Sequence, residues 1–578
     1  MPGFFSLEAA KVELGVVEAV TESMSTTRQA YQATQQGVSM RLLSSLRETI
    51  WSKFDHLLYL PVLKLERPRD LYYYQGQGLK SLYGFTYKYL PLEQFLGQLT
   101  RLKWGQPLAN ALARCYTQAW YEAFETLFIF ADWHVKPHWT KSFAHSGSVT
   151  MWGRVMPGTK QLVVTGPQGR LLIGWNRAID SHFSGVLVDM EAELATIVGR
   201  PIAYTIVDSE GSGLALAERY AEADRYYLSV LPRNPSHYLT EFNFQGQWQA
   251  VVDDPQHEVI EATWADEAKA AQEVRRLILM RPVASTQPTQ VYAGRIPTTI
   301  AVAQIPALFR QRWYHQEWRF REMVKGVNLN ANYGYSYDQV PHRTRQRQWE
   351  KAQEKVEVTP GKLAQGGEAL TNLRPQLVQL RQRYGHKRTE LGQELNLYQQ
   401  TLTQRQQAGQ TTGRCQQQIG RCQRQLRTLT ARYQKRRRTL LTCLRQQRQQ
   451  QGQLQAQLLQ REAERDAIDT DTLCRERHLE KDQIMLNLQL LLTNLHDWAA
   501  EHYFAPEWQT LEVETATRLI YQKPGRVSWE ADQIVVELAA YRYPDQQRAM
   551  ETTCDRFNAA NLRWRDGRLL RIYVARGP

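Results

Sequence analysis

The chain has 578 residues, of which 42% are hydrophobic, which suffices for several packed domains and excludes an intrinsically disordered protein. Its 72 Lys and Arg outnumber its 58 Asp and Glu, and the net charge of +14 favours a polyanionic partner such as nucleic acid. No run approaches the roughly 18 apolar residues of a spanning helix, and MPGFFSLEAAKVELG lacks the features of a signal peptide. We therefore expect a cytoplasmic protein with no membrane partner.

Residues 1–122 are predicted to form an N-terminal helical, DNA-binding region, because apolar residues recur at intervals of three and four. Between its helices lies the stretch RPRDLYYYQGQGLKSLYGFTYKY. Its arginines, lysines and tyrosines suit a surface that contacts phosphates and stacks on bases, but an aromatic-rich packing loop explains them equally well.

Residues 123–234 predict the first part of an α/β core. FETLFIFAD is typical of a buried strand whose last residue, Asp132, emerges at the carboxyl end of a sheet. The runs SVTMWGRVM, KQLVVTG and GRLLIGW predict a meander with Pro-Gly and Gly-Pro-Gln-Gly turns, and PIAYTIVDSEG predicts a strand that ends at Asp208. One such aspartate is typical of a turn cap, whereas two in one sheet indicate a site.

Residues 235–303 predict a β-rich insertion, and residues 304–344 contain a helix from PALFRQRW to about Gly326. On a straight helix Trp313, Glu317, Phe320 and Val324 share an apolar stripe. A carboxylate there requires a cation, which is either a neighbouring arginine such as Arg321 or a metal ion. Glu322 projects about 140° away from Glu317 on a 3.6-residue helix and is predicted to lie at the surface.

Residues 345–505 predict a Gln- and Arg-rich arm with heptad-like apolar spacing, either a helical hairpin that turns at AGQTTG or one long coiled-coil helix with a stutter. Arg414 to Arg448 contains eleven Lys or Arg, including Arg436, Arg437 and Arg438, and no Asp or Glu. This run indicates contact with the DNA backbone, although a merely solubilising surface is the alternative. Residues 506–578 predict a small α+β module.

Three carboxylates on separate elements match the needs of a two-metal site. Asp132, Asp208 and Glu317 would hold two Mg²⁺ ions, with Mn²⁺ as a substitute, for chemistry on a phosphodiester. The basic Arg312, Arg321 and Lys325 are expected to hold DNA beside them. His134, His138 and His145 are interpreted as loop residues near DNA, with His134 lining the site, because Pro137 breaks the helix that a zinc-binding His pair would need.

Four motifs, ADWHVKPHW, MWGRVMPGTKQLVVTGPQG, TIVDSEG and RWYHQEWRFREMVKGVNLNANYGYSY, resemble bacterial insertion-sequence transposases of the DDE type over roughly residues 70–340. The resemblance implies an RNase H-like mixed sheet with a β-strand insertion and Mg²⁺-dependent cutting and joining of DNA ends. It assigns the three acids to Asp132, Asp208 and Glu317.

This sequence also departs from the family signature of Tyr, Arg, Glu and Lys at fixed helical intervals. Phe309 replaces the Tyr, Glu317 and Lys325 each lie one residue further along, and Ser209 stands where many relatives have Arg.

The leading hypothesis is therefore a transposase, nucleoid-associated, that acts on double-stranded DNA, namely the terminal inverted repeats of an element and its target. It is expected to be a homodimer on DNA. The alternatives are a non-catalytic nucleic-acid-binding protein with a decayed transposase core and a two-metal nuclease that cuts without joining.

Overall fold

The computed structural model describes residues 3, 5–34, 46–73, 88–140, 144–232, 241–334, 336–409, 411–564 and 566–576. Most of the tyrosine-rich stretch lies outside these residues, so its two interpretations stay open. The chain divides into two compact units, Met1–Gln339 with Arg475–Pro578 and the arm Val340–Cys474. Among the described residues, no helix combines the length and the apolarity needed to cross a lipid bilayer.

The first unit begins with helices, as predicted for residues 1–122. Their bounds are α1 Phe5–Glu13, α2 Val16–Thr34, α4 Leu46–Leu58, α6 Tyr89–Arg101 and α7 Gly105–Tyr121. Their apolar faces share one hydrophobic core with the sheet and with the C-terminal segments. These helices are therefore part of the main unit and not a separately folded domain.

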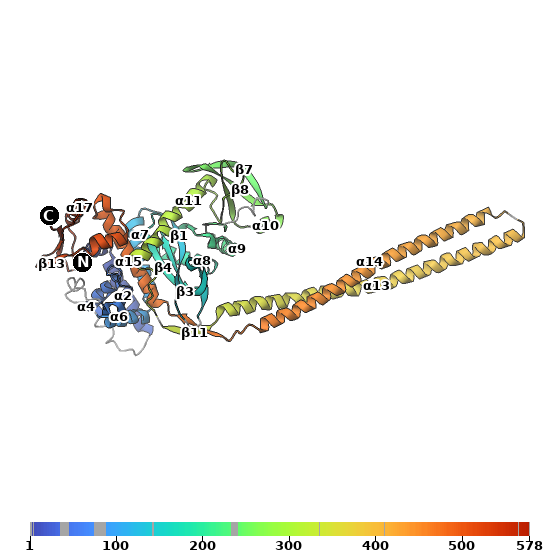
Figure 1. The fold of residues 1–578 in the computed structure, drawn as a ribbon, viewed down its shortest axis with the longest axis horizontal. Helices are drawn as coiled ribbons and strands as arrows, with labels where there is room; N and C mark the ends of the chain where they lie inside the picture. Colours follow the sequence, from blue (N-terminus) through green and yellow to red (C-terminus); the bar gives the residue numbers. More distant parts are fainter. Residues whose placement is uncertain are drawn as a thin grey trace. The chain divides into compact units, whose positions relative to one another are not determined.

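A large mixed sheet forms the middle of this unit (Figure 1). Its strands are β1 Leu127–Pro137, β2 Ser146–Val149, β3 Arg154–Thr165, β4 Leu171–Ala178, β5 Ile202–Ile206, β6 Tyr227–Val230, β7 Phe242–Val251, β8 Asp254–Trp264, β9 Arg276–Pro282 and β10 Gln290–Gly294. β3 runs antiparallel to β1 and β4, whereas β5 and β6 follow on the other side of β1 in parallel. Antiparallel β10, β9, β8 and β7 extend the sheet beyond β6.

Two predicted strand limits are wrong. β1 does not end at Asp132 but continues to Pro137, because β3 is long enough to pair with it over that distance. The predicted turn at Pro157 and Gly158 lies inside β3, so the first and second runs of the meander are joined through it. β2 and β4 pair with successive parts of the same strand.

Helices connect and cover the strands. Their bounds are α8 Phe183–Val198, α9 Leu214–Glu222, α10 Glu267–Gln272, α11 Ile305–Arg312 and α12 Trp318–Gly326. Between α11 and α12 the chain forms one π-helical turn, η7, over Trp313–Glu317. The predicted helix up to Gly326 is thus present, but it is not straight.

The helix α15, Glu480–His502, is buried on nearly all sides and belongs to the first unit, although the sequence analysis assigns it to the arm. Its amides at 483, 487 and 494 share one face and bind the backbone of β4. Gln483 Oε1, Asn487 Oδ1 and Asn494 Oδ1 accept from the N–H groups of Asn176, Gly174 and Leu171, and their amide nitrogens donate to the carbonyls of Gly174 and Leu171. α15 therefore satisfies the edge of β4 where a further strand would otherwise pair.

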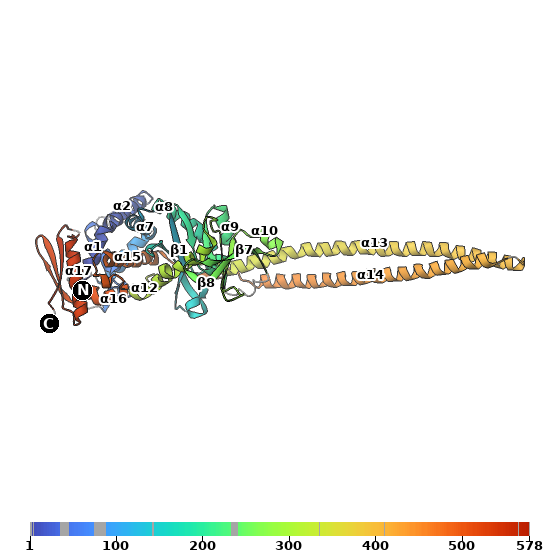
Figure 2. The same cartoon turned by 90° about the horizontal axis from the view of Figure 1, so that it is seen from above.

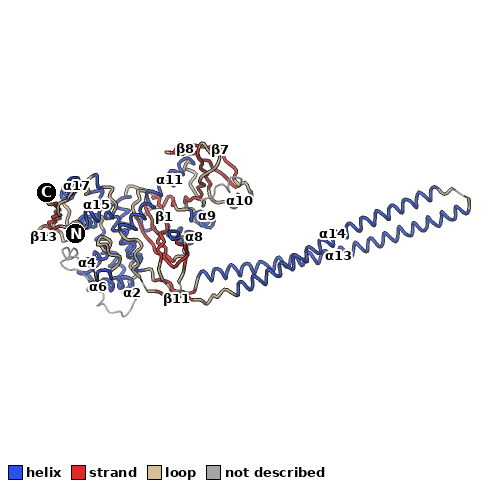
Figure 3. The backbone as a smooth tube through the Cα atoms, in the orientation of Figure 1, coloured by secondary structure: helices blue, strands red, loops and turns tan. Residues whose placement is uncertain are grey.

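The arm is an antiparallel hairpin of two long helices, α13 Arg343–Gln407 and α14 Gly413–Asp466, which run side by side in Figures 2 and 3. The rings of Tyr384 and Tyr433 stack between them at 4.0 Å. The hairpin was one of two predicted alternatives and is confirmed over the described residues. Short strands β11 Tyr337–Pro341 and β12 Leu473–Arg477 pair at its base.

The C-terminal segment is α+β as predicted, with β13 Gly525–Trp529, β14 Gln533–Leu538, α17 Pro544–Ala559 and β15 Leu569–Val574. The strand predicted at RLIYQK is wrong. There the chain forms most of a π-turn, η9 Thr517–Tyr521, in which Ile520 and Tyr521 are buried, and a short helix, α16 Val513–Ala516, precedes this turn. Burial in the shared core thus overrides the β propensity of this run.

Candidate functional site

Asp132 lies where β1 leaves its parallel neighbour. The parallel ladder ends at the pair Phe130 and Ile206, and Asp132 follows two residues later while β1 still pairs with β3. Its side chain is 12% exposed, and one carboxylate oxygen accepts from the N–H of Trp133 at 2.7 Å. The strand-end position is therefore correct relative to β5, although β1 itself continues.

Asp208 follows β5 at the same edge of the sheet. It caps a short 3₁₀ helix, η4 Ser209–Ser212, and its side chain accepts from the N–H of Glu210 at 2.9 Å. Its charge reaches Asp132, where it contributes to the raised pKa of that carboxyl. The sheet thus brings the two predicted aspartates into electrostatic contact, as expected for adjacent parallel strands.

Glu317 is the last residue of the π-turn η7. In a continuous α-helix Arg312 and Glu317, five residues apart, would point about 140° away from each other. A π-turn closes i to i+5 hydrogen bonds and brings such residues onto one face. The π-turn thus explains how Glu317 shares a face with Arg312 despite the five-residue spacing.

Arg312 bridges two of the acids. Its Nη2 lies 2.5 Å from Asp132 Oδ2, and its Nη1 donates to Glu317 Oε1 at 2.7 Å. The guanidinium is 10% exposed. The cation required by Glu317 is therefore Arg312 and not the alternative Arg321, and Arg312 is held inside the site where the sequence analysis expected it to contact DNA.

The electrostatics show an excess of negative charge. The pKa of Asp132 is raised to about 7, mainly by burial and also by the charge of Asp208, although Arg312 opposes both effects. Burial lowers the pKa of Arg312, but the attraction of Asp132, Glu317 and Asp208 outweighs it and the net shift is upward. One guanidinium thus faces three carboxyl groups.

A cavity of about 690 Å³ opens beside these groups. Asp208, Arg312 and Glu317 line it together with Tyr292, Phe309, Trp313 and Tyr314. Within the described ranges, no three His, Cys, Asp or Glu side chains are grouped closely enough to hold a metal ion. The position of Arg312 between Asp132 and Glu317 explains why the predicted ligands do not form such a group.

His134 is not in a loop, as expected, but in β1. It is 7% exposed, its Nε2 donates to the Asn330 side-chain oxygen at 2.8 Å, and its ring stacks on Phe320. Burial lowers its pKa to about 4, so the ring is neutral at pH 7. Its side chain is therefore enclosed in the core beside the acids and does not reach the surface.

The other predicted DNA-binding residues are exposed. Arg321 and Lys325 lie four residues apart on α12, and the Arg321 guanidinium lies 5.9 Å from the Trp318 ring. Arg436, Arg437 and Arg438 are exposed on α14. Their contact with DNA stays a prediction.

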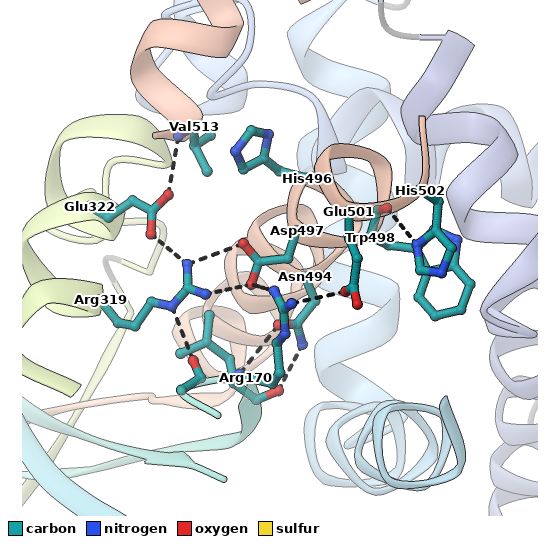
Figure 4. A network of polar contacts seen from close by, with 12 residues as sticks. Arg170, Arg319, Glu322, Asn494, His496, Asp497, Trp498, Glu501, His502 and Val513 are labelled. Atoms are coloured by element: carbon teal, nitrogen blue, oxygen red, sulfur yellow. Dashed lines mark hydrogen bonds and ion pairs between the residues drawn. The ribbon is translucent and has the colours of Figure 1, made fainter. Parts of the chain in front are cut away.

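Glu322 is buried at 5% exposure, so its predicted surface position is wrong. It does point away from Glu317, but that direction faces the core, whereas Trp313 in the supposed apolar stripe is 53% exposed. Glu322 accepts from the N–H of Val513 at 3.1 Å and from Arg319 at 2.7 Å (Figure 4). Phe320 and Val324 of the predicted stripe do pack against the core, so the buried side of α12 is wider than predicted and includes Glu322.

Arg319 anchors α12 in this network, a role that the sequence analysis missed. It binds both carboxylate oxygens of Asp497 on α15, at 3.1 and 2.8 Å, and donates through Nε to the Gly169 carbonyl (Figure 4). Arg170 pairs with the same Asp497 at 2.8 Å and with Glu501. The end of the π-turn after Glu317 is thus fixed to α15, while Arg312 fixes the end before it.

The turn between β3 and β4 packs against η7. Gly169 adopts φ +73°, and a side chain there would lie 3.1 Å from the Cα of His315. Gln316, which is buried in η7, donates to the Val163 carbonyl of β3 at 3.1 Å. The one sequence signal for this arrangement was the Gly-Pro-Gln-Gly turn, which predicts a loop but does not indicate that the loop packs against η7.

No protein-family model matches the chain, and a search of curated proteins finds no significant match.

Proposed function

We propose that the protein is a DNA transposase with an RNase H-like core that cuts and joins DNA at the ends of an insertion sequence. The observation that carries the proposal is the convergence of Asp132, Asp208 and Glu317 on one guanidinium. The strand order β4, β3, β1, β5, β6, with β5 and β6 parallel to β1, supports an RNase H-like assignment, and β7 to β10 are its proposed insertion.

The donor set fits magnesium in charge and chemistry. Carboxylate oxygens are the ligands that Mg²⁺ and Mn²⁺ prefer, and the cluster retains negative charge beyond what Arg312 compensates. Asp132, Asp208 and Glu317 would hold the two ions after Arg312 moves away from Asp132 and Glu317. Bound in this way, the ions supply activation of a water or 3'-hydroxyl and stabilisation of the leaving oxygen.

The residues of the chain have separate tasks. β1 and the segment after β5 fix two carboxylates at one sheet edge, and the clamped π-turn directs the third at them. Arg312, once displaced, becomes a cation for a phosphate beside the site, and the exposed Arg321 and Lys325 hold the DNA backbone nearby. A homodimer would bring two inverted-repeat ends together, in the cytoplasm and on the nucleoid.

The test incubates the purified protein with labelled candidate terminal-repeat DNA and Mg²⁺. Asp132→Ala is expected to abolish cleavage, whereas Asp189→Ala, which removes a carboxylate that is 71% exposed, is expected to retain it. Equal cleavage by the wild type and Asp132→Ala contradicts the catalytic role. Nicks without joined products identify a nuclease.

One observation favours the alternative of a non-catalytic DNA-binding protein. Arg312 already pairs with Asp132 and Glu317, so these two acids have an internal cation without a metal ion. This alternative expects DNA binding by the wild type with no cleavage at any Mg²⁺ or Mn²⁺ concentration.

A further inference from the structure

The positive charge of the chain is concentrated in one part of the arm. Between Arg374 and Arg448 there are 17 Lys or Arg and two acids, Glu390 and Glu394, a surplus of 15 against +14 for the whole chain. The remainder of the protein is thus close to neutral. Any long-range attraction to a polyanion comes from this segment.

The packing of the hairpin determines which way these charges point. α14 buries Cys415, Cys422 and Leu444 towards α13, and Tyr433 stacks on Tyr384. At 3.6 residues per turn, the side chains of Arg424, Lys435 and Arg438 lie within about 40° of the direction opposite this seam. The outer face of α14 is therefore basic within the stretch from Arg414 to Arg448.

These charges are not compensated within the arm. All eleven basic residues from Arg414 to Arg448 are exposed, and none of them forms an ion pair among the described residues. The ion pair described nearby joins Lys387 and Glu390, both on α13. A run of like charge this dense repels itself unless an anion lies against it.

The residue types favour a nucleic-acid duplex over other polyanions. Ten of the eleven are arginines, whose planar guanidinium matches phosphate oxygens better than an ammonium does. A membrane surface requires an apolar face and a single strand requires aromatic stacking, but the large exposed hydrophobic residues described in the arm lie outside this stretch. They are Trp349, Val358, Val378, Leu397, Leu459 and Leu473.

We propose that the outer face of α14, from Arg414 to Arg448, binds the phosphate backbone of duplex nucleic acid without sequence specificity. At 1.5 Å per residue the face is about 51 Å long, which corresponds to about 15 base pairs at 3.4 Å each. The binding requires neither the acids nor a metal ion. It is therefore independent of the proposed transposase activity.

The test measures binding of 30-base-pair DNA duplexes of two unrelated sequences to the full chain with Asp132→Asn, in EDTA, across a range of salt concentration. The variant carries Arg424→Gln, Lys435→Gln and Arg438→Gln. Gln keeps a helix propensity close to that of Arg and Lys, and circular dichroism checks the fold. The matched control carries Lys351→Gln, Lys355→Gln and Lys362→Gln, three exposed arm lysines on α13 with glutamates nearby in the sequence.

The variant is expected to reduce the slope of log affinity against log salt by about 2.7, since each phosphate contact contributes about 0.9. The control is expected to leave the slope within about one contact of the starting chain. An unchanged slope in the variant overturns the proposal, and so does equal competition by polyglutamate. A preference of more than about tenfold for one duplex overturns its lack of specificity. If the wild type binds the duplexes but does not cleave terminal-repeat DNA, the proposed transposase activity is contradicted and the proposed binding surface on α14 is not.

Discussion

Arg312 lies 2.5 Å from Asp132, so the first of the candidate metal ligands is paired with a cation from the same helix region that carries Glu317. A buried ion pair is weak evidence of stability, because desolvation offsets its attraction, but loss of one partner leaves an uncompensated charge. The carboxylates can thus be compensated either by Arg312 or by a bound metal ion. The competition between Arg312 and a metal ion can be measured as a change in stability.

Arg312→Gln is expected to destabilise the metal-free protein by about 3–5 kcal/mol and to increase its stabilisation by Mn²⁺, because the carboxylates lose their internal cation. Thermal unfolding in EDTA and with Mn²⁺ measures both effects. The matched control is Arg310→Gln, which removes a 40% exposed arginine paired with Asp254. An equal Mn²⁺ shift in the wild type and in both variants would contradict the role of Arg312.

The pH dependence of stability is expected to reveal Asp132. Its pKa is raised from 3.8 to about 7 by burial and by Asp208, so the folded state binds the proton more tightly than the unfolded state does. The contribution of this carboxyl to stability therefore falls as pH rises from about 4 to 7. Urea unfolding of the wild type and Asp132→Asn in EDTA measures it as a difference. A difference that is constant from pH 4.5 to 7.5 would show that Asp132 has an ordinary pKa.

Asp497→Asn is expected to cost about 3–5 kcal/mol of the free energy of unfolding, because Arg319 and Arg170 both lose a buried partner. The control pair Arg548 and Asp545 is 73% and 89% exposed, and Asp545→Asn is expected to cost less than about 1 kcal/mol. A double-mutant cycle with Arg319→Gln isolates the pair. A coupling energy near zero would show that the Arg319–Asp497 pair does not help to position Glu317.

Gly169→Ala tests the contact between the β3–β4 turn and the π-turn. Gly169 has φ +73° and approaches His315, whereas Gly153 has φ +58° with nothing within 4 Å of an added side chain. Gly153→Ala is expected to cost about 1–2 kcal/mol for its backbone conformation, and Gly169→Ala is expected to cost more because His315 must also move. Equal unfolding free energies for the two variants would show that the contact contributes nothing.

The order of strands and helices around the acids was predictable because apolar runs and turns mark them locally. The positions of Asp132 and Asp208 at one sheet edge followed from parallel pairing. The orientation of the helix that carries Glu317 was not predictable in the same way, since one π-turn changes the facing of every later residue. On the assumed straight helix the arginine alternative for Glu317 was Arg321, with a metal ion as the other alternative, whereas the structure pairs Glu317 with Arg312.

Burial on α12 was also decided by distant segments. Glu322 lies inside because Val513 and Arg319 provide its hydrogen bonds, and Arg319 in turn binds Asp497, more than 170 residues away in the sequence. No local pattern identifies such partners. The same reason explains α15, which follows the arm in the sequence but is buried in the main unit by its contacts with β4.

The amides of α15 on the edge of β4 have a consequence for synthesis of the chain. The ribosome completes β4 long before α15. The arm, which is translated between them, spans 135 residues from Val340 to Cys474. At about 5–20 residues per second, translation of the arm alone takes roughly 7–27 seconds. During that interval the outer edge of β4 is open, which makes chaperone binding or premature strand pairing at β4 the vulnerable step of its biogenesis.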